Sequence, residues 1–308
     1  MRLNGRRESS NVEDRRGQRG GRLSGGLGGL LNGLGGLGGG GGMKKGGIGI
    51  GVIIVIAIAT LIFGGDPTSI FKGGSPLLND ASTESSYTPT TEDEELARFS
   101  RQILASTEDV WSQEFAKMGK TYRAPTLVLF TGAVESACGQ ATAAVGPFYC
   151  SGDEKLYIDL DFFRTMKQNL GADGDFAYAY VIAHEVGHHV QHLLGILDAG
   201  HSQMAQSSKS EANKTSVRIE LQADFLAGVW GYHENRLFNS LDDGDIEEAV
   251  NAASKIGDDI LQQQGQGYVV PDAFTHGRAD QRMKWLKRGL TTGDLDYGDT
   301  FSPRYDQL

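Results

Sequence analysis

This chain of 308 residues is poor in cysteine, with Cys138 and Cys150 as its only two. They are twelve positions apart, and neither a second cysteine pair nor a histidine lies close by. That spacing lacks the usual form of a cysteine-based zinc site, so the pair is a poor candidate for binding zinc. Basic residues are also in deficit after residue 45, where 20 Lys and Arg face 36 Asp and Glu. An acidic body of this kind argues against nucleic acid as a partner.

The first 45 residues lack the regular apolar spacing of a folded element. Residues 1–19 are polar and charged, while residues 20–47 consist mainly of Gly and Leu, and glycine runs oppose ordering through their backbone entropy. Nine basic residues face three acidic ones in residues 1–45. The sequence therefore predicts a disordered cytoplasmic tail and a Gly-rich linker over residues 1–45. A binding role for the arginines of the tail is the alternative.

Charge is absent from residues 46–65, a run of apolar and small residues. A helix of about twenty apolar residues crosses the hydrocarbon core of a bilayer. Lys44 and Lys45 precede the run and Asp66 follows it, so the positive-inside rule places the N-terminus in the cytoplasm and the body outside. A cleaved signal peptide is the alternative, but the preceding region is too long and no small-x-small cleavage site follows. We therefore expect a single uncleaved transmembrane helix in the lipid bilayer.

The folded domain is predicted to span residues 92–308. Residues 66–91 are rich in Ser, Thr, Pro and Gly, as expected of a flexible linker. Thr91-Glu-Asp-Glu94 then has the form of a capping box ahead of an apolar helical pattern. Strands are predicted at residues 124–132 and 155–159.

Cys138 and Cys150 lie between these two strands. If the body is extracytoplasmic, the two thiols can pair, and closing the loop would stabilise the fold by roughly 3 kcal/mol. A pair of buried thiols is the alternative. The predicted membrane topology favours the disulfide.

A His-Glu-x-x-His pattern lies inside an apolar helical run. His184 and His188 are four positions apart, so on a helix their imidazoles project from one face and can reach one zinc ion at about 2.0–2.1 Å. Glu185 is turned by about 100° from His184 and suits a general base toward water activated by the zinc. A core helix with hydrogen-bonded histidines is the alternative.

The third zinc ligand is expected from another helix, because the metzincin pattern would need Gly and His where Gln191 and Leu194 stand. In a second helical run, over residues 217–230, Glu220 and Asp224 share one face next to apolar positions, where unpaired acids are costly. We predict that Glu220 is the third ligand. We predict that Asp224 holds a ligand histidine by its other ring nitrogen. Two solvated acids are the alternative.

Residues outside these two helices are also candidates for the site. His276 is the candidate for stabilising the oxyanion that forms when water attacks a carbonyl, with a structural or capping role as the alternative. Arg282 is a candidate for pairing with an acid. The strand around Tyr157 is a candidate for pairing with the extended backbone of a peptide substrate.

With these residues identified, the chain resembles the bacterial family of neutral zinc metallopeptidases anchored in the inner membrane. The Glu-x-x-Ala-Asp element is also similar to that of membrane proteases related to the CAAX-processing enzymes, where the Glu is a zinc ligand; the matching residue here is Glu220. The resemblance implies an α+β, zincin-like fold, mostly helical, in which a small sheet packs on the helix pair that carries the metal. The likeness runs through nearly the whole chain outside the linkers. The segments that carry it are Met1–Ser9, Gly146–Cys150, Tyr157–Leu160, His184–Gln191, Glu220–Asp224 and Thr275–Gly277.

The combined expectation is a membrane-anchored, zinc-dependent endopeptidase whose catalytic domain lies outside the bacterial inner membrane, in the periplasm or extracytoplasmic space. It would hydrolyse peptide bonds of envelope proteins or peptides by zinc-activated water, with Glu185 as the general base. The alternative is a non-catalytic, zinc-stabilised scaffold that docks envelope proteins. Hydrolysis of cell-wall peptide cross-links would differ from the first expectation only in its substrate.

Overall fold

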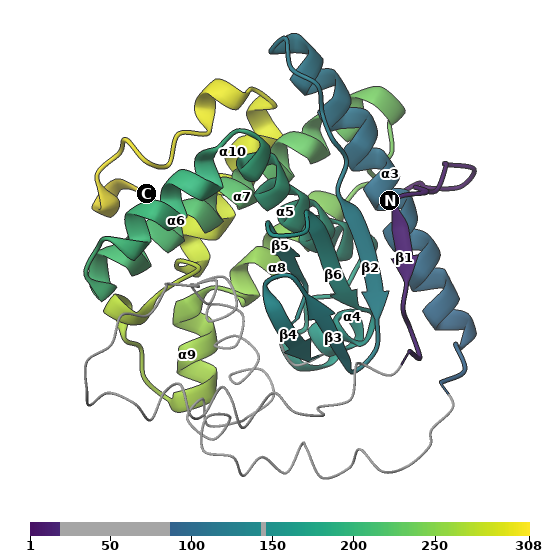
Figure 1. The fold of residues 1–308 in the computed structure, drawn as a ribbon, viewed down its shortest axis with the longest axis horizontal. Coiled ribbons are helices and arrows are strands. Elements are labelled where there is room, and N and C mark those ends of the chain that lie inside the picture. The colour runs from purple at the N-terminus through teal and green to yellow at the C-terminus, as the bar shows by residue number, and fades with distance from the viewer. Residues whose placement is uncertain (19–86, 143–145) are drawn as a thin grey trace, which may run out of the picture.

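The computed structural model describes residues 1–18, 87–142 and 146–308, and Figure 1 shows their arrangement. The strands are β1 (Val12–Asp14), β2 (Thr126–Phe130), β3 (Ala133–Ser136), β4 (Gly139–Thr142), β5 (Phe148–Cys150) and β6 (Lys155–Asp159). The α-helices are α3 (Thr91–Lys117), α4 (Asp161–Thr165), α5 (Asp175–Leu193), α6 (Ile196–Ala205), α7 (Lys209–Phe238), α8 (Asp245–Lys255), α9 (Asp258–Gln266) and α10 (Ala279–Thr292). Short helical turns are η3 (Met166–Leu170), η4 (Pro271–Ala273), η5 (Leu295–Tyr297) and η6 (Tyr305–Gln307).

A small mixed sheet lies beside a larger group of helices, as expected for the predicted α+β class (Figure 1). Its strand order is β1-β2-β6-β5, with β1, β2 and β6 parallel and β5 antiparallel to β6. The two predicted strands are confirmed as β2 and β6. Four of the five residues in each strand are buried, so both faces of these strands are covered. β3 and β4 form a separate antiparallel hairpin.

The main core lies between the sheet and four helices. Each helix contributes a large ring that is at most 1% exposed: Trp111 of α3, Tyr180 of α5, Trp230 of α7 and Trp285 of α10. Burial of such rings is the largest apolar contribution available to a domain of this size. The rigid helix group that results is the scaffold on which the candidate site is built.

The prediction that residues 1–19 form a disordered tail is wrong for residues 1–18, which pack on the domain. Val12 of β1 is paired with Leu127 of β2, so this segment supplies one edge of the sheet. Its charges are matched by acids of the domain, for example Arg6 by Glu234 at 2.8 Å. Charge pairing and one row of strand hydrogen bonds order a segment in which no apolar periodicity is present.

The capping box predicted at the start of the first long helix is displaced by one position. Helix α3 begins at Thr91, and its capping box is formed by Thr90 and Asp93, one position before the predicted box. The side chain of Thr90 accepts the N–H of Asp93 at 3.1 Å, and the Asp93 carboxylate accepts the N–H of Thr90 at 2.7 Å.

The predicted transmembrane segment 46–65 lies outside the described residues, as do residues 20–45 and 66–86 of the predicted linkers. Among the helices of the described ranges, none combines the length and the apolar composition that a bilayer crossing requires.

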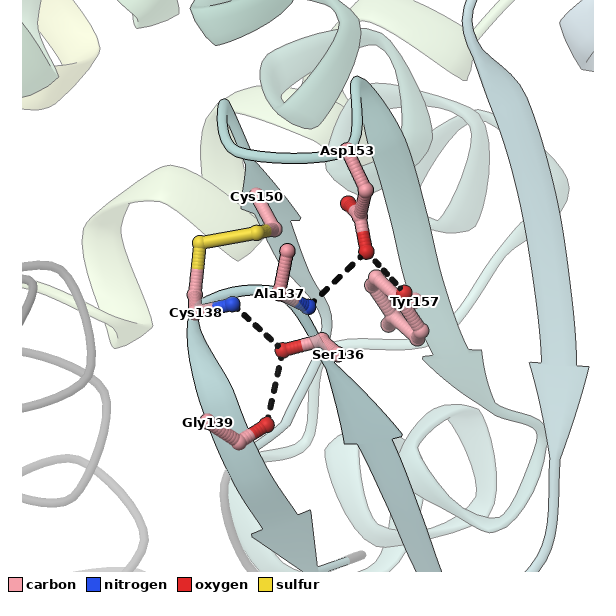
Figure 2. Close-up of a disulfide and its surroundings, with 7 residues drawn as sticks. All are labelled: Ser136, Ala137, Cys138, Gly139, Cys150, Asp153 and Tyr157. Carbon is pink, nitrogen blue, oxygen red and sulfur yellow. Dashed lines mark hydrogen bonds between the residues drawn. A yellow bond between two sulfur atoms is a disulfide. The ribbon is translucent and has the colours of Figure 1, made fainter.

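The predicted disulfide is confirmed, since Cys138 and Cys150 are bonded (Figure 2). It joins the turn between β3 and β4 to strand β5. The same turn is held by Asp153, whose carboxylate accepts the N–H of Ala137 at 3.0 Å and the hydroxyl of Tyr157 at 2.6 Å (Figure 2). The hairpin is thus fastened to the end of the sheet that faces helix α5.

Candidate metal centre

Helices α5 and α7 cross in direct backbone contact, and this contact sets the geometry of the site. Gly187 lies at the crossing, where a Cβ would come within 3.0 Å of the carbonyl oxygen of Ala223. A close backbone approach is what compensates for a glycine inside a helix, which costs about 1 kcal/mol relative to alanine. The crossing brings the His-Glu-x-x-His turn of α5 against the Glu220 turn of α7.

His184, His188 and Glu220 lie together at this crossing. One ligand atom from each lies within 4.8 Å of the others, and in the part of the chain that the structure describes this is the group suited to hold a metal ion. Glu220 Oε2 is 3.2 Å from His184 Nε2, and Glu220 Oε1 is 3.5 Å from His188 Nε2. Two imidazoles and a carboxylate are the donor set of many catalytic zinc sites, so the group fits zinc.

Each imidazole has its other nitrogen occupied, which leaves Nε2 directed at Glu220. His184 Nδ1 is 2.8 Å from Asp224 Oδ1, as the sequence predicted for Asp224. His188 Nδ1 is 2.9 Å from Gln191 Oε1, and the Gln191 amide nitrogen donates in turn to the carbonyl of Ile219 at 2.8 Å. Such partners fix the tautomer and the ring orientation of a ligand histidine. Sequence reasoning missed Gln191, although its place three residues after His188 puts it on the same face of the helix.

Asp224 is the centre of a buried charge network. Arg282 donates to both of its oxygens, at 2.8 and 2.9 Å, and the Tyr180 hydroxyl donates at 2.6 Å. The prediction that Arg282 pairs with an acid is therefore confirmed. Burial raises the pKa of Asp224, but Arg282 and His184 outweigh burial and hold the pKa at about 2. The carboxylate is thus a fixed negative charge that keeps His184 Nδ1 protonated.

The electrostatics of the three candidate ligands favour a cation between them. Burial opposes the charge on Glu220, yet His188 and His184 hold its pKa well below the usual range, so it is an anion. Burial alone dominates at His188 and lowers its pKa to about 4, so this ring is neutral and has a lone pair at Nε2. Burial also disfavours charge on His184, but Asp224 and Glu220 raise its pKa to about 10. Without a metal ion, His184 therefore keeps a proton that metal binding would displace.

Glu185 lies beside this group without belonging to it. Burial raises its pKa to about 7, while His184, Arg282 and, least of all, the backbone N–H of Tyr149 in β5 lower it. A carboxyl group with a pKa near neutrality can both accept and return a proton, as general acid–base catalysis requires. The position of Glu185 is thus compatible with the predicted role.

His276 is held at the start of α10 by a residue that the sequence did not reveal. Asp258 Oδ1 is 3.1 Å from His276 Nδ1, and Asp258 Oδ2 accepts the N–H groups of Thr275, His276 and Gly277 at 2.7, 2.7 and 3.0 Å. His276 is 4% exposed, and its charge contributes to the low pKa of Glu220. The ring is therefore fixed near the metal centre with Nδ1 occupied.

The other two histidines of α5 point elsewhere. His189 is fully buried, with Nε2 2.6 Å from the carbonyl oxygen of Arg123 and Nδ1 2.9 Å from the Tyr149 hydroxyl. His192 faces Asp198 and Glu154, at 3.3 and 3.7 Å. His189 therefore has a structural role and ties α5 to strand β5.

The prediction that the strand around Tyr157 pairs with substrate is wrong. Tyr157 lies on β6, whose two edges are already occupied by β2 and β5. The strand at the edge of the sheet next to Glu185 is β5, which carries Tyr149 and ends at the disulfide. An added strand would therefore run along β5.

Comparison with known proteins agrees with the sequence and the site. Residues 1–301 match the family described as "Putative neutral zinc metallopeptidase". The uncharacterized protein YpfJ of Escherichia coli strain K12 is 48% identical over 301 residues, which cover 98% of this chain and 99% of the relative. The uncharacterized protein Rv2575 of Mycobacterium tuberculosis strain H37Rv is 44% identical over 191 residues, which cover 59% of this chain and 64% of the relative. No solved structure matches.

The family match spans both the His-Glu-x-x-His helix and the helix of Glu220, and it also includes the N-terminal segment that packs on the domain. The three candidate ligands, of which His184 and Glu220 are buried and His188 is partly buried, agree with this family description. The chain therefore belongs to the neutral zinc metallopeptidase family.

Proposed function

We propose that this protein is a zinc-dependent endopeptidase with a zincin-like fold. The observation that carries the proposal is the convergence of His184, His188 and Glu220 from two crossing helices, with Glu185 next to them and outside the set. A zinc ion held by the three side chains would acidify water and polarise the carbonyl of a peptide bond. His184, His188 and Glu220 are thus proposed as its ligands.

The residues around the ligands would carry the remaining steps. Glu185 accepts a proton from the attacking water and returns it to the nitrogen of the departing amine. His276, whose Nδ1 contacts Asp258 Oδ1, would stabilise negative charge on the carbonyl oxygen. Asp224 and Gln191 keep both ligand imidazoles in one orientation throughout.

The substrate proposed is an extended stretch of polypeptide from envelope proteins or peptides. A peptide that adds as a strand to β5 would lie across Glu185, because the N–H of Tyr149 in β5 already reaches that carboxylate. Backbone pairing of this kind accepts many sequences. The proposal is consistent with attachment to the bacterial inner membrane through residues 46–65 and with a domain in the extracytoplasmic space, where the Cys138–Cys150 disulfide would persist.

Replacement of Glu185 by Gln separates hydrolysis from metal binding. The Glu185→Gln variant of the full chain should keep its zinc, measured by elemental analysis. It should lose roughly 10²–10⁴-fold in hydrolysis of an unfolded protein or a peptide library, as expected for loss of a general base. Glu211→Gln, an exposed change on α7, is the matched control and should preserve both properties.

Two outcomes would contradict the proposal. Hydrolysis that survives Glu185→Gln would exclude Glu185 as the base. A wild-type protein that binds zinc, unfolds when a chelator removes it and cleaves nothing would instead be the zinc-stabilised scaffold.

A further inference from the structure

The N-terminal segment, residues 1–18, is bound along the domain by backbone hydrogen bonds and by ion pairs. Backbone hydrogen bonds join the N–H of Leu127 to the carbonyl of Asn11 at 2.9 Å and the N–H of Arg15 to the carbonyl of Leu129 at 2.7 Å. Glu13 forms an ion pair with Lys155 of β6 at 2.6 Å. These contacts make the segment the edge strand of the sheet, and among the residues that the structure describes no other strand covers β2 on that side.

The domain depends on this segment to satisfy a buried charge. Glu234 of α7 is 0% exposed, and its carboxylate accepts hydrogen bonds from Arg6 and from the Ser106 hydroxyl. Arg6 also stacks over the ring of Phe238, with 3.5 Å between the guanidinium carbon and the ring centre. A buried carboxylate without its cation is strongly unfavourable. The buried carboxylate of the domain is therefore neutralised by a residue of the segment 1–18.

The two ends of the interval between Gln18 and Tyr87 lie side by side. A Cβ placed on Gly17 would come within 2.8 Å of the ring of Tyr87. The N–H of Gly17 donates to the Thr131 side chain at 2.9 Å, and Arg16 pairs with Glu94 of α3 at 2.9 Å. The chain thus leaves the folded domain and returns to it at one place.

We propose that residues 1–18 lie in the same compartment as the metallopeptidase domain, as a permanent part of its fold. Whatever path the chain takes between Gln18 and Tyr87, that path begins and ends on one side of any membrane that residues 46–65 enter. This arrangement excludes a cytoplasmic N-terminus combined with an extracytoplasmic domain. It holds whether or not the domain hydrolyses peptides.

Single cysteines report the side on which each part lies. Gln18→Cys and Asp243→Cys place a thiol on exposed positions of the segment and of the domain, both away from the metal centre. The native cysteines are bonded to each other and do not react with maleimides. Each full-length variant is treated with a membrane-impermeant maleimide in spheroplasts and, separately, in inverted membrane vesicles. We expect both thiols to be labelled in the same preparation. Labelling of one in spheroplasts and of the other in inverted vesicles would overturn the proposal.

A zero-length cross-link tests the packing itself. Glu13 and Lys155 are close enough for a carbodiimide to join them by an amide bond, detected as one cross-linked peptide pair by mass spectrometry of isolated membranes. Lys155→Arg keeps the ion pair but removes the amine, so the product should disappear in this variant. Absence of the product in the wild-type chain would show that the segment is not docked and would overturn the proposal even if both thiols were labelled together.

Discussion

At the scale of single residues, Asp258 shows how one carboxylate can fix both a loop and a ring. Its Oδ2 accepts three consecutive backbone N–H groups, while its Oδ1 holds His276. Burial raises the pKa of Asp258, but His276 and the backbone donors lower it below the ordinary 3.8. Burial lowers the pKa of His276, but Asp258 raises it above the ordinary 6.5. The two groups therefore form a charged pair inside the protein.

Asp258→Asn should destabilise the protein in a pH-dependent way. The pKa of Asp258 is lowered in the folded protein, so the stability that this residue contributes is present above about pH 4. It is lost as pH falls through the folded pKa. The pKa of His276 is raised in the folded protein, so the stability that this residue contributes is complete below about pH 6.5. It is lost as pH rises through the folded pKa. The variant should thus lose most free energy of unfolding, about 3 kcal/mol, between about pH 4 and 6.5. The loss should become smaller at lower and at higher pH. Denaturant unfolding across this range measures it, with the exposed Asp272→Asn as control. A deficit that does not change with pH would contradict the charged pair.

The site residues that could be recognised from the sequence have close neighbours along the same helix. Asp258, which was missed, has its partner farther along the chain. His184, Glu185 and His188 follow from helical spacing within one turn, and Glu220 with Asp224 from the spacing within a second helix. Asp258 and His276 are 18 positions apart and meet across a loop, which no local pattern encodes. The catalytic roles assigned to these site residues are predictions.

At the scale of elements, the sequence predicted the central helices well and the connections poorly. The polar, Ser- and Lys-rich composition of residues 196–215 predicts a loop, but these residues contain α6 and the start of α7. The apolar positions of α6 are few, yet Leu197 and Met204 bury themselves against Ile219 of α7. A helix that is stabilised by tertiary contacts at two positions has too weak a pattern to be recognised in the sequence. Residues 242–263 likewise have an amphipathic pattern that predicts one helix, but the structure divides them into α8 and α9, with Gly257 at the break.

The contact between α5 and α7 can be tested at Gly187. Gly187→Ala gains about 1 kcal/mol of helix propensity, but the new methyl group would lie 3.0 Å from the Ala223 carbonyl oxygen, which belongs to rigid helix backbone. The helices must separate by a few tenths of an ångström, and Glu220 moves away from the two imidazoles. We expect zinc affinity to fall by roughly tenfold, comparable to loss of a group that orients a ligand. Competition with a chromogenic chelator measures the affinity.

Gly200→Ala is the matched control for that variant. Gly200 lies on α6, and its added methyl group would meet the tip of the flexible Ile219 side chain, which can rotate. Zinc affinity should therefore stay close to that of the wild type. Equal affinities for all three proteins would show that the backbone crossing does not set the ligand geometry.

At the scale of the whole molecule, the sequence misplaced the boundary of the folded domain. Polar composition and the absence of apolar periodicity predicted that residues 1–45 are separate from the domain, whereas residues 1–18 form its edge strand. The contacts that order this segment are mainly ion pairs with residues about 100 or more than 200 positions away, such as Arg7 with Glu108 and Arg6 with Glu234. Charge complementarity over such separations leaves no periodic signal in the sequence.

The contribution of the segment to stability is concentrated at one buried ion pair. Arg6→Ala would leave the fully buried Glu234 with the Ser106 hydroxyl as its partner, and breaking a buried pair from one side costs roughly 3–5 kcal/mol. The Arg6 side chain is 17% exposed, so we expect the lower end of that range, measured as a shift of the denaturant midpoint of the full chain. Arg2→Ala, which breaks an ion pair with Asp242 that is half-exposed on both sides, should cost less than about 1 kcal/mol. Adding Glu234→Gln to Arg6→Ala removes the stranded charge and should recover part of the loss. If Arg6→Ala were no more damaging than Arg2→Ala, the domain would not need its N-terminal segment to neutralise its core.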